Sequence, residues 1–289
     1  MAIIIRRTMT ICFVSLFVLL NCSLVYADGS RPVSSDVQIT PATIDLTEAT
    51  HTHVAVTATV TDADGCVGIS ATAKLFRTDL TSACTAPDLN NCYAPVAMTQ
   101  DSCSGGVAAY TGDIEVQYYA DPTDAGTYAD YTWSAEVIPS DAGGAGTQTG
   151  GGDPTELNTL TALNVSTPIT YGELALNGIT ADTTAFDTTV TNTGNKATIG
   201  VQVKSGAATA MVCTIGTIPV GNEKYDDVST TVYASKISLT AGDVTVADVS
   251  AAKTTNGSTG NTDTVGWGLQ MPATGVVGTC AGTVVFTAL

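Results

Sequence analysis

Hydrophobic and polar residues alternate with a period of two along much of this chain. Residues 53–61 read His-Val-Ala-Val-Thr-Ala-Thr-Val-Thr, and residues 128–138 read Tyr-Ala-Asp-Tyr-Thr-Trp-Ser-Ala-Glu-Val-Ile. This alternation is typical of strands with one buried face, whereas the repeat of three and four residues expected of a helix does not recur. The chain is therefore predicted to be all-β. Further strands are expected over residues 67–76, 111–119, 155–165, 169–176, 197–203, 210–218, 230–235, 236–239, 264–270 and 283–288.

Turn-forming residues divide this pattern into two parts. A glycine-rich tract over residues 141–153 has the composition of a linker, but residues 155–165 read as the strand that closes a sandwich of about seven strands. We therefore interpret the tract as a long loop and place the boundary at Pro168, because proline does not continue the interior of a paired strand. The predicted organisation is a signal peptide over residues 1–27 and two β-sandwich domains, 28–167 and 168–289, each large enough for its own core.

The first 27 residues have the features of a secretory signal peptide. Arg6 and Arg7 precede an apolar run over residues 11–25, and Ala27 supplies the small residue of a cleavage site. We expect cleavage and a mature chain that is secreted, extracellular or associated with the cell surface. Gly, Thr and Asp interrupt every later apolar run, so the mature chain is predicted to have no transmembrane segment.

Acidic residues outnumber basic residues. The full chain holds 27 Asp and Glu against 10 Lys and Arg, a net charge of −17, and loss of Arg6 and Arg7 with the signal peptide makes the mature charge −19. A negative field of this size disfavours nucleic acid and anionic membrane surfaces as partners, and it attracts cations.

Six cysteines follow the signal peptide, an even number that predicts disulfides in an exported chain. Four of them precede residue 110 and two follow residue 210, so pairing inside each group is the simplest arrangement. A zinc site is the rival interpretation, but no CxxC pair occurs and the mature chain has only two histidines. The predicted disulfides are Cys66 with Cys103, Cys84 with Cys92, and Cys213 with Cys280.

Short stretches in both parts resemble known β-sandwich families. Residues 59–65 (T-V-T-D-A-D-G) and residues 131–137 (Y-T-W-S-A-E-V) are similar to the immunoglobulin-like or cadherin-like repeats of bacterial adhesins and invasins. Residues 169–176, which contain Tyr171-Gly172, and residues 188–203 together look like the immunoglobulin-like modules of bacterial surface and secreted proteins. The stretch T-x-T-N-T-G-N at residues 189–195 is predicted to form a hairpin. Residues 192–195 would form its turn, because Asn and Gly tolerate positive φ. The resemblance implies two tandem immunoglobulin-like domains and transfers no catalytic residue.

Residues 77–106 depart from such a plain repeat. This predicted insertion is polar, rich in turns, and contains Cys84, Cys92 and Cys103. It reads either as a recognition loop shaped by disulfides or as an exposed segment that the disulfides hold in place.

Four aspartates are candidate calcium ligands. Asp62 and Asp64 follow a predicted strand, and Asp141 and Asp153 bound the glycine-rich loop. These loops share one pole of an immunoglobulin-like sandwich, where carboxylate and carbonyl oxygens would suit calcium. The EF-hand pattern is absent, because Ala73 stands where its bidentate Glu is expected. Ala-Asp-Gly is also an ordinary hairpin signal, so a calcium site and a simple turn both stay open.

Two further cation sites are considered. Asp121 and Asp124 occupy a loop nearer the domain boundary, where calcium would stiffen the pair of domains, although a turn at Pro122 explains this loop as well. His51 and His53 place two imidazoles on one strand face, as a transition-metal site would require. The sequence identifies no third ligand beside them, so exposed strand histidines are the alternative.

The sequence shows no catalytic motif such as a G-x-S-x-G elbow, an H-E-x-x-H helix or a phosphate loop. We therefore predict a non-enzymatic, extracellular structural or adhesion protein of the cell surface, stabilised by disulfides and calcium. Its expected partners are a surface protein, a glycan or copies of itself. Self-assembly into a filament would use residues 28–40 or 283–289 as strands added to a neighbouring sheet.

Two other functional classes stay open. A carbohydrate-binding module would expose a row of rings, whereas a structural protein would bury most of them; the candidates are Tyr118, Tyr119, Tyr128 and Tyr131. Trp133 shares a strand face with Tyr131 and is predicted to be a core anchor rather than a sugar platform. A secreted hydrolase would need an acid or a histidine whose removal abolishes turnover.

Overall fold

The computed structural model describes residues 29–84, 87–166, 168–182, 184–256, 258 and 262–289. Over these residues the chain is all-β, and its helical segments are short 3-10 turns: η1 (Thr78–Ala83), η2 (Gly126–Tyr128) and η3 (Val220–Asn222). The predicted fold class is confirmed. The predicted signal peptide lies outside the described residues. None of the helical segments in the described part of the chain is long and apolar enough to cross a membrane.

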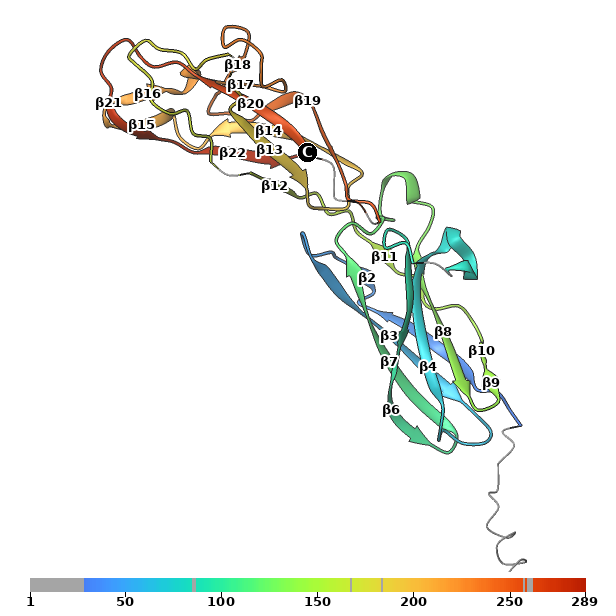
Figure 1. Cartoon of the computed structure of the whole chain (residues 1–289). Helices are drawn as coiled ribbons and strands as arrows, with labels where there is room; N and C mark the ends of the chain where they lie inside the picture. The colour runs from blue at the N-terminus through green and yellow to red at the C-terminus, as the bar shows by residue number, and fades with distance from the viewer. Residues whose placement is uncertain (1–28, 85–86, 167, 183, 257, 259–261) are drawn as a thin grey trace, which may run out of the picture.

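The first half of the described chain, residues 29–157, forms a sandwich of two sheets. Within the described residues, one sheet has the order β10-β1-β3-β7-β6 and the other has the order β5-β4-β8-β9. A short parallel pair, β2 (Thr43–Ile44) and β11 (Glu156–Leu157), lies at the end nearer the rest of the chain (Figure 1). The other strands are β1 (Val33–Thr40), β3 (His51–Thr61), β4 (Ser70–Arg77), β5 (Cys92–Ala97), β6 (Thr99–Ser104), β7 (Val107–Gln117), β8 (Trp133–Asp141), β9 (Gly144–Ala145) and β10 (Thr147–Gln148).

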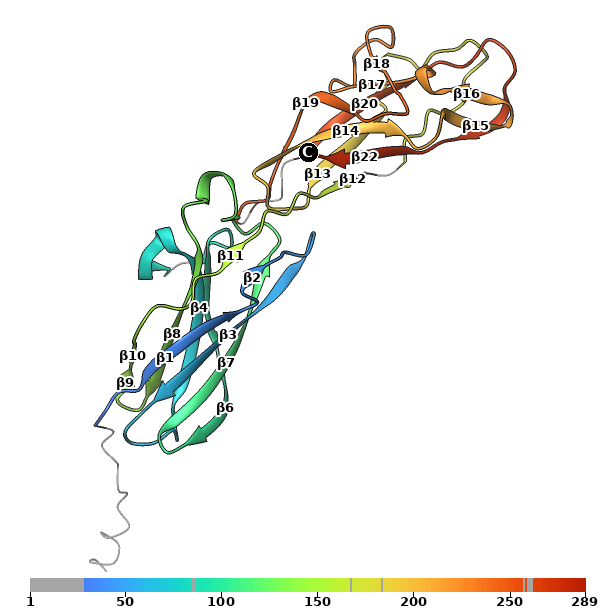
Figure 2. The same ribbon diagram turned by 180° about the vertical axis from the view of Figure 1, so that it is seen from behind.

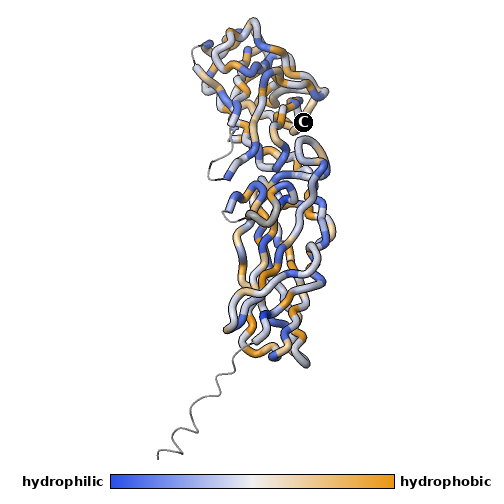
Figure 3. Tube along the Cα trace, turned by 90° about the vertical axis from the view of Figure 1, so that its right-hand side faces the viewer, coloured by the Kyte–Doolittle hydropathy of each residue, from blue (hydrophilic) through white to orange (hydrophobic). Residues whose placement is uncertain are grey.

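The core of the first half comes from the alternation that the sequence shows. Every second residue of β3 and β7 is buried, which places Val54, Val56, Ile114 and Val116 between the sheets. Trp133 at the start of β8 is fully buried, and its indole Nε1 donates to the carbonyl of Asp121 at 3.1 Å. The prediction that this tryptophan anchors the core is confirmed. Figure 3 shows the alternation as changing colour along the strands.

The second half, residues 163–289, forms its own pair of sheets. Within the described residues their orders are β12-β13-β20-β17-β18 and β19-β14-β22, and a small sheet, β16-β15-β21, lies at the far end. Trp267 is buried between them, with its ring centroid 6.0 Å from that of Tyr225. The strands are β12 (Leu163–Val165), β13 (Asp187–Asn192), β14 (Thr198–Ser205), β15 (Thr209–Ile215), β16 (Thr217–Pro219), β17 (Glu223–Asp226), β18 (Ile237–Ser238), β19 (Val244–Ala252), β20 (Thr262–Leu269), β21 (Val277–Ala281) and β22 (Val284–Ala288).

The two halves lie end to end along one long axis (Figures 1 and 2). The chain passes from one set of sheets to the other between β11 and β12, at residues 158–162, because β12 already pairs with β13 of the second half. This crossing precedes the boundary predicted at Pro168. It also divides the single strand expected over residues 155–165 into two short ones.

The expected hairpin over residues 188–203 is wrong. β13 pairs with β12 and β20, whereas β14 pairs with β19 and β22 in the other sheet, so the segment crosses between sheets. Residues 192–195 have no positive φ. Thr193 is instead bonded to Glu48 of the first half and Asn195 to the connecting segment, as described below, and those contacts replace the turn of a hairpin.

Two strands expected in the second half are absent from the described residues there. Residues 169–176 make no strand, and residues 230–235 form turns. The ammonium of Lys236 donates to the carbonyls of Val228 and Ser229, both at 3.3 Å, and so ties together the two ends of the second segment. These contacts accompany a compact loop, in which the strand preference of the Thr and Val side chains is overridden.

The predicted insertion is also different from what the sequence suggested. Within residues 77–106, β5 pairs with β4 and β6 pairs with β7, so these strands complete opposite sheets of the sandwich. The segment expected to be free for assembly, residues 28–40, contains β1, which is paired on both sides in its own sheet. The terminal strand β22 likewise pairs with β14 of its own half.

Candidate functional site

The contact region between the two halves, which we call the joint, contains a network of ion pairs and hydrogen bonds. From the first half it uses loops beside η1 and after β7. From the second half it uses residues 192–197 and the segment of residues 253–256 that follows β19. These segments lie far apart in the sequence and side by side in the structure (Figures 1 and 2).

An ion-paired aspartate lies at the centre of the joint. Asp121 receives the guanidinium of Arg77 from its own half and the ammonium of Lys253 from the second half. The exposed fractions of these side chains are 6% for Asp121, 4% for Arg77 and 13% for Lys253. Asp121 and Asp124, which were considered as calcium ligands, both have partners within the protein. Cations from the protein neutralise Asp121, and Asp124 accepts a hydrogen bond from the hydroxyl of Thr159 at 2.6 Å.

Arg77 is fixed by three further features. It pairs with Asp79 through two hydrogen bonds of 2.8 Å, and its Cζ lies 3.5 Å from the ring centroid of Tyr128. Burial lowers the pKa of Arg77, but the bond to Asp79 and the charge of Asp121 outweigh this and raise it above its ordinary value. The same bond lowers the pKa of Asp79. The guanidinium therefore stays charged and presents a fixed partner to Asp121.

An asparagine beside the ion pair ties the second half to the first. Asn90 is buried, and its Nδ2 donates to the carbonyls of Tyr119 and Thr254 at 3.0 and 3.5 Å. Its Oδ1 accepts from the backbone N–H of Asn256 at 2.6 Å. The hydroxyls of Tyr118 and Thr254 are 2.9 Å apart. Because the amide both donates and accepts, it fixes the register of the docked segment.

The stretch that the sequence marked as a hairpin turn forms the other side of the joint. Asn195 is fully buried; its Oδ1 accepts from the N–H of Leu160 at 2.6 Å, and its Nδ2 donates to the carbonyl of Asn158 at 3.0 Å. Thr193 donates its hydroxyl to Glu48 at 2.6 Å. A Cβ on Gly194 would lie 2.1 Å from the carbonyl oxygen of Leu160, so glycine is required here for close approach.

Asp62 and Asp64 lie at the opposite pole of the first half, in the loop between β3 and β4. Asp62 Oδ1 accepts from the N–H of Asp64 and the hydroxyl of Ser30, both at 2.9 Å. Asp64 Oδ2 accepts from the N–H groups of Gly29 and Ser30, both at 3.2 Å. The two carboxylates therefore build a turn that also holds the residues preceding β1.

The other two predicted calcium ligands have separate surroundings. Asp141 Oδ1 accepts from the N–H groups of Gly143 and Gly144 at 2.8 and 3.0 Å, closing the connection from β8 to β9. The backbone N–H of Asp153 donates to the carbonyl of Val37, far along β1 from the pole where Asp62 lies. The structure does not gather the four carboxylates into one ligand group among the described residues.

All three predicted disulfides are present among the described residues: Cys66–Cys103, Cys84–Cys92 and Cys213–Cys280. Cys66–Cys103 links the loop after β3 to β6, and Cys84–Cys92 links the end of η1 to β5 beside the joint. Cys213–Cys280 joins β15 to β21 at the far end of the second half. The pairing inside each sequence group is confirmed.

The tyrosines proposed as a sugar platform have different roles. Tyr118 contacts Thr254 across the joint, and Arg77 covers one ring face of Tyr128. The rings of Tyr118 and Tyr119 are nearly perpendicular, at 88°. Tyr131 is exposed. A flat row of ring faces open to solvent is not formed by these four residues.

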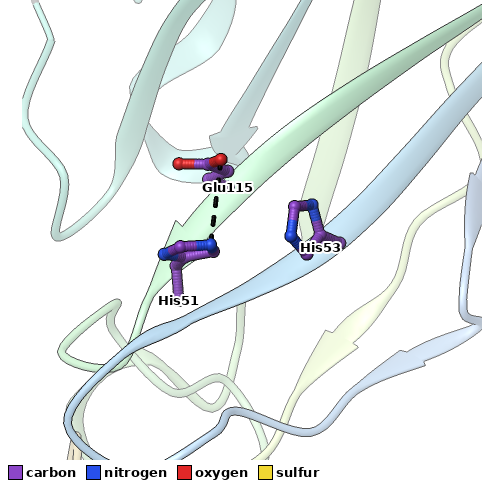
Figure 4. A group of neighbouring side chains, drawn as sticks. All are labelled: His51, His53 and Glu115. Carbon is purple, nitrogen blue, oxygen red and sulfur yellow. Dashed lines mark ion pairs between the residues drawn. The ribbon is translucent and has the colours of Figure 1, made fainter.

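The two histidines lie on the outer face of the first half, where the structure brings a third ligand type to them (Figure 4). His53 is paired in register with Glu115 of β7, and His51 Nε2 lies 3.7 Å from Glu115 Oε1. His53 Nδ1 lies 2.7 Å from Asp113 Oδ2. One ligand atom from each of His51, His53 and Glu115 lies within 4.8 Å of the others, and this is the group of metal-ligating side chains found in the described residues.

Sequence reasoning missed the partners of these groups rather than the groups themselves. Asp121, His51 and His53 were singled out, but Lys253 and Glu115 were not. A usable signal exists for the lysine, since only eight basic residues follow residue 27, and a buried aspartate that is paired with a cation has its partner among them. Glu115 follows from strand register, which the alternation pattern does not fix.

Comparison with protein-family models gives no match for this chain, and comparison with curated proteins gives no match either.

Proposed function

We propose that this chain is a non-enzymatic, extracellular structural or adhesion protein of the cell surface, in which two immunoglobulin-like sandwiches are held end to end as a stiff spacer. The observation that supports this proposal is the joint. Paired domains without a large apolar interface are expected to move relative to one another. Here buried charges and an amide bond across the contact instead, so bending would break the pair of Asp121 with Lys253 and the bonds of Asn90 to the second half.

The disulfides and the acidic composition agree with an exported protein. Each disulfide fixes a loop or an edge strand, and structural disulfides of this kind persist in oxidising compartments. The negative field keeps copies apart in solution and disfavours polyanionic partners. A surface protein or a glycan would then be contacted by the ends of the spacer rather than by its bonded middle.

Self-assembly by strand addition has less support than a spacer acting alone. β1 is enclosed between β10 and β3, so a neighbour receives it only after it leaves its own sheet. β22 is an edge strand of its own sheet, so a strand from a neighbouring copy could still pair with its free side. The carbohydrate-binding alternative has less support, because its four candidate tyrosines do not form a flat exposed row.

The spacer is tested by small-angle scattering of the purified chain, with Asp121→Asn beside it. The expected result is one extended particle for the wild type and a flexible pair of bodies for the variant. A flexible wild type would overturn the proposal. Binding of the wild type to arrays of glycans and surface proteins, without turnover of any arrayed compound, is expected for an adhesion protein; turnover lost on a single acid substitution would establish a hydrolase.

A further inference from the structure

We infer that the outer face of the first half carries a binding site for a divalent transition-metal ion of the zinc and copper class, with His51, His53 and Glu115 as ligands. This site is separate from the joint and from the aspartates first considered for calcium. It is independent of the proposed spacer function.

The scaffold of the site is the longest strand pair of the first half. β3 and β7 pair without a register break from His51 opposite Gln117 to Thr61 opposite Val107. Val54, Ile114 and Val116 point into the core, so the intervening side chains, His53 and Glu115 among them, lie on the outer face. Because the core fixes this register, the ligands are held by rigid elements rather than by a loop.

The distances suit one ion. Zinc bonds to nitrogen and oxygen of about 2.0–2.2 Å in a tetrahedral arrangement separate the ligand atoms by about 3.3 Å. His51 Nε2 and Glu115 Oε1 are 3.7 Å apart, close to that value, and the whole group lies within 4.8 Å. The side chains are between 37% and 61% exposed, so ordinary rotamer changes are free to close the remaining gap.

A fourth residue completes the arrangement. Asp113 holds one ring nitrogen of His53, which orients the imidazole and leaves its other nitrogen for the ion, the role that carboxylates have beside metal-binding histidines. Asp113 is therefore a positioning residue. Two imidazoles with one carboxylate favour zinc or copper, whereas calcium takes oxygen ligands. A three-residue set leaves an open position for water or a ligand from outside.

The test is calorimetric titration of the untagged chain with zinc chloride, copper chloride and calcium chloride. One zinc or copper ion per chain is expected, with no competition from calcium. His51→Ala and His53→Ala should each weaken zinc binding at least about tenfold, and Asp113→Asn roughly tenfold. Asp130→Asn, which removes an exposed charge elsewhere on the same half, should leave it unchanged. Zinc binding retained by the double histidine variant, or a site that prefers calcium, would overturn the inference.

A second measurement uses the unmodified protein, so it does not require that the variants fold. The chain contains two histidines, so each imidazole gives its own nuclear magnetic resonance signals in the unmodified protein. Zinc should shift the signals of both rings together with the binding heat. Signals that stay in place, or movement of one ring alone, would show that the ion is not shared between His51 and His53.

Discussion

Asp121 of the first half and Lys253 of the second half form an ion pair whose side chains are only 6% and 13% exposed. Asp121 also has Arg77 as a partner from its own half, so its charge is compensated even before the two halves meet. Lys253 gains its carboxylate partner only when they meet. The pair therefore favours this relative placement of the halves, because a placement that buries the lysine away from Asp121 would leave it with neither water nor a carboxylate.

Removal of the shared carboxylate should cost more than removal of the lysine. In Asp121→Asn the buried Lys253 loses its charged partner and Arg77 keeps only Asp79, and we expect the free energy of unfolding to fall by about 3–5 kcal/mol. In Lys253→Met the pair of Asp121 with Arg77 survives, so a smaller loss is expected. Urea denaturation followed by tryptophan fluorescence measures both, since Trp133 donates to the carbonyl of Asp121.

An exposed ion pair provides the matched control. Lys204 and Asp243 lie 3.1 Å apart with exposed fractions of 35% and 41%, and Lys204→Met should cost only about 0–1 kcal/mol. Equal, small losses for all three variants would mean that the joint does not hold the halves together.

Asp62 and Asp64 should stabilise the fold without calcium. The Asp62 carboxylate accepts hydrogen bonds from the hydroxyl of Ser30 and the backbone N–H of Asp64, so Asp62→Ala is expected to cost about 1–3 kcal/mol. Thermal denaturation in calcium and in chelator checks this, with the same loss expected in both. A midpoint that rises with calcium in the wild type and not in the variant would instead establish the calcium site that the sequence also allows.

Strand identity in the first half could be predicted because the physical cause is local. Alternating side chains in β3, β4, β7 and β8 decide which face is buried, and the tryptophan of β8 is too large to be left in solvent. The disulfide pairs were also predictable, since the cysteines fall into two groups along the sequence and each group allows few pairings. These features depend on short stretches of sequence.

The remaining features depend on partners that are distant in the sequence. Asn195 resembles a turn residue, but its amide is bonded to Leu160 and Asn158 of the connecting segment. Residues 230–235 are rich in Thr and Val but form turns, and Lys236 binds the carbonyls of Val228 and Ser229 just before them. Glu115 meets the histidines only through register. In each case a tertiary contact overrides the local preference, and alternation carries no information about it.

The three disulfides should differ in strength according to the chain length that they close. Cys213 and Cys280 are separated by 67 residues, and Cys84 and Cys92 by 8. Loop-closure entropy gives about 4 kcal/mol for the longer loop and about 2.5 kcal/mol for the shorter. Replacement of each pair by alanine, followed by urea denaturation, should show the larger loss for Cys213 and Cys280. The reverse order would mean that packing of the buried Cys84 and Cys92, rather than the entropy of the unfolded chain, decides their contribution.

Glu223 is a buried acid whose ionisation the fold opposes. It is 3% exposed at the start of β17, and its Oε1 accepts the hydroxyl of Tyr171 at 2.8 Å. Burial raises the pKa of Glu223, and the bond from Tyr171 opposes this shift only in part. Above the pKa of the unfolded chain the unfolded state releases this proton while the folded state retains it. Folding stability attributable to this group therefore falls as the pH rises from that value through the raised pKa.

Glu223→Gln should remove this loss while keeping an oxygen for Tyr171. The variant is expected to be more stable than the wild type at neutral pH and equally stable below about pH 4, where the wild-type carboxyl is protonated in both states. Each tenfold change in proton affinity on folding contributes about 1.4 kcal/mol to the difference. Thermal midpoints between pH 3.5 and 8 measure it, with Glu173→Gln as the control that removes an exposed charge nearby. A gain that does not depend on pH would trace the effect to packing, and a gain shared with the control would trace it to net charge.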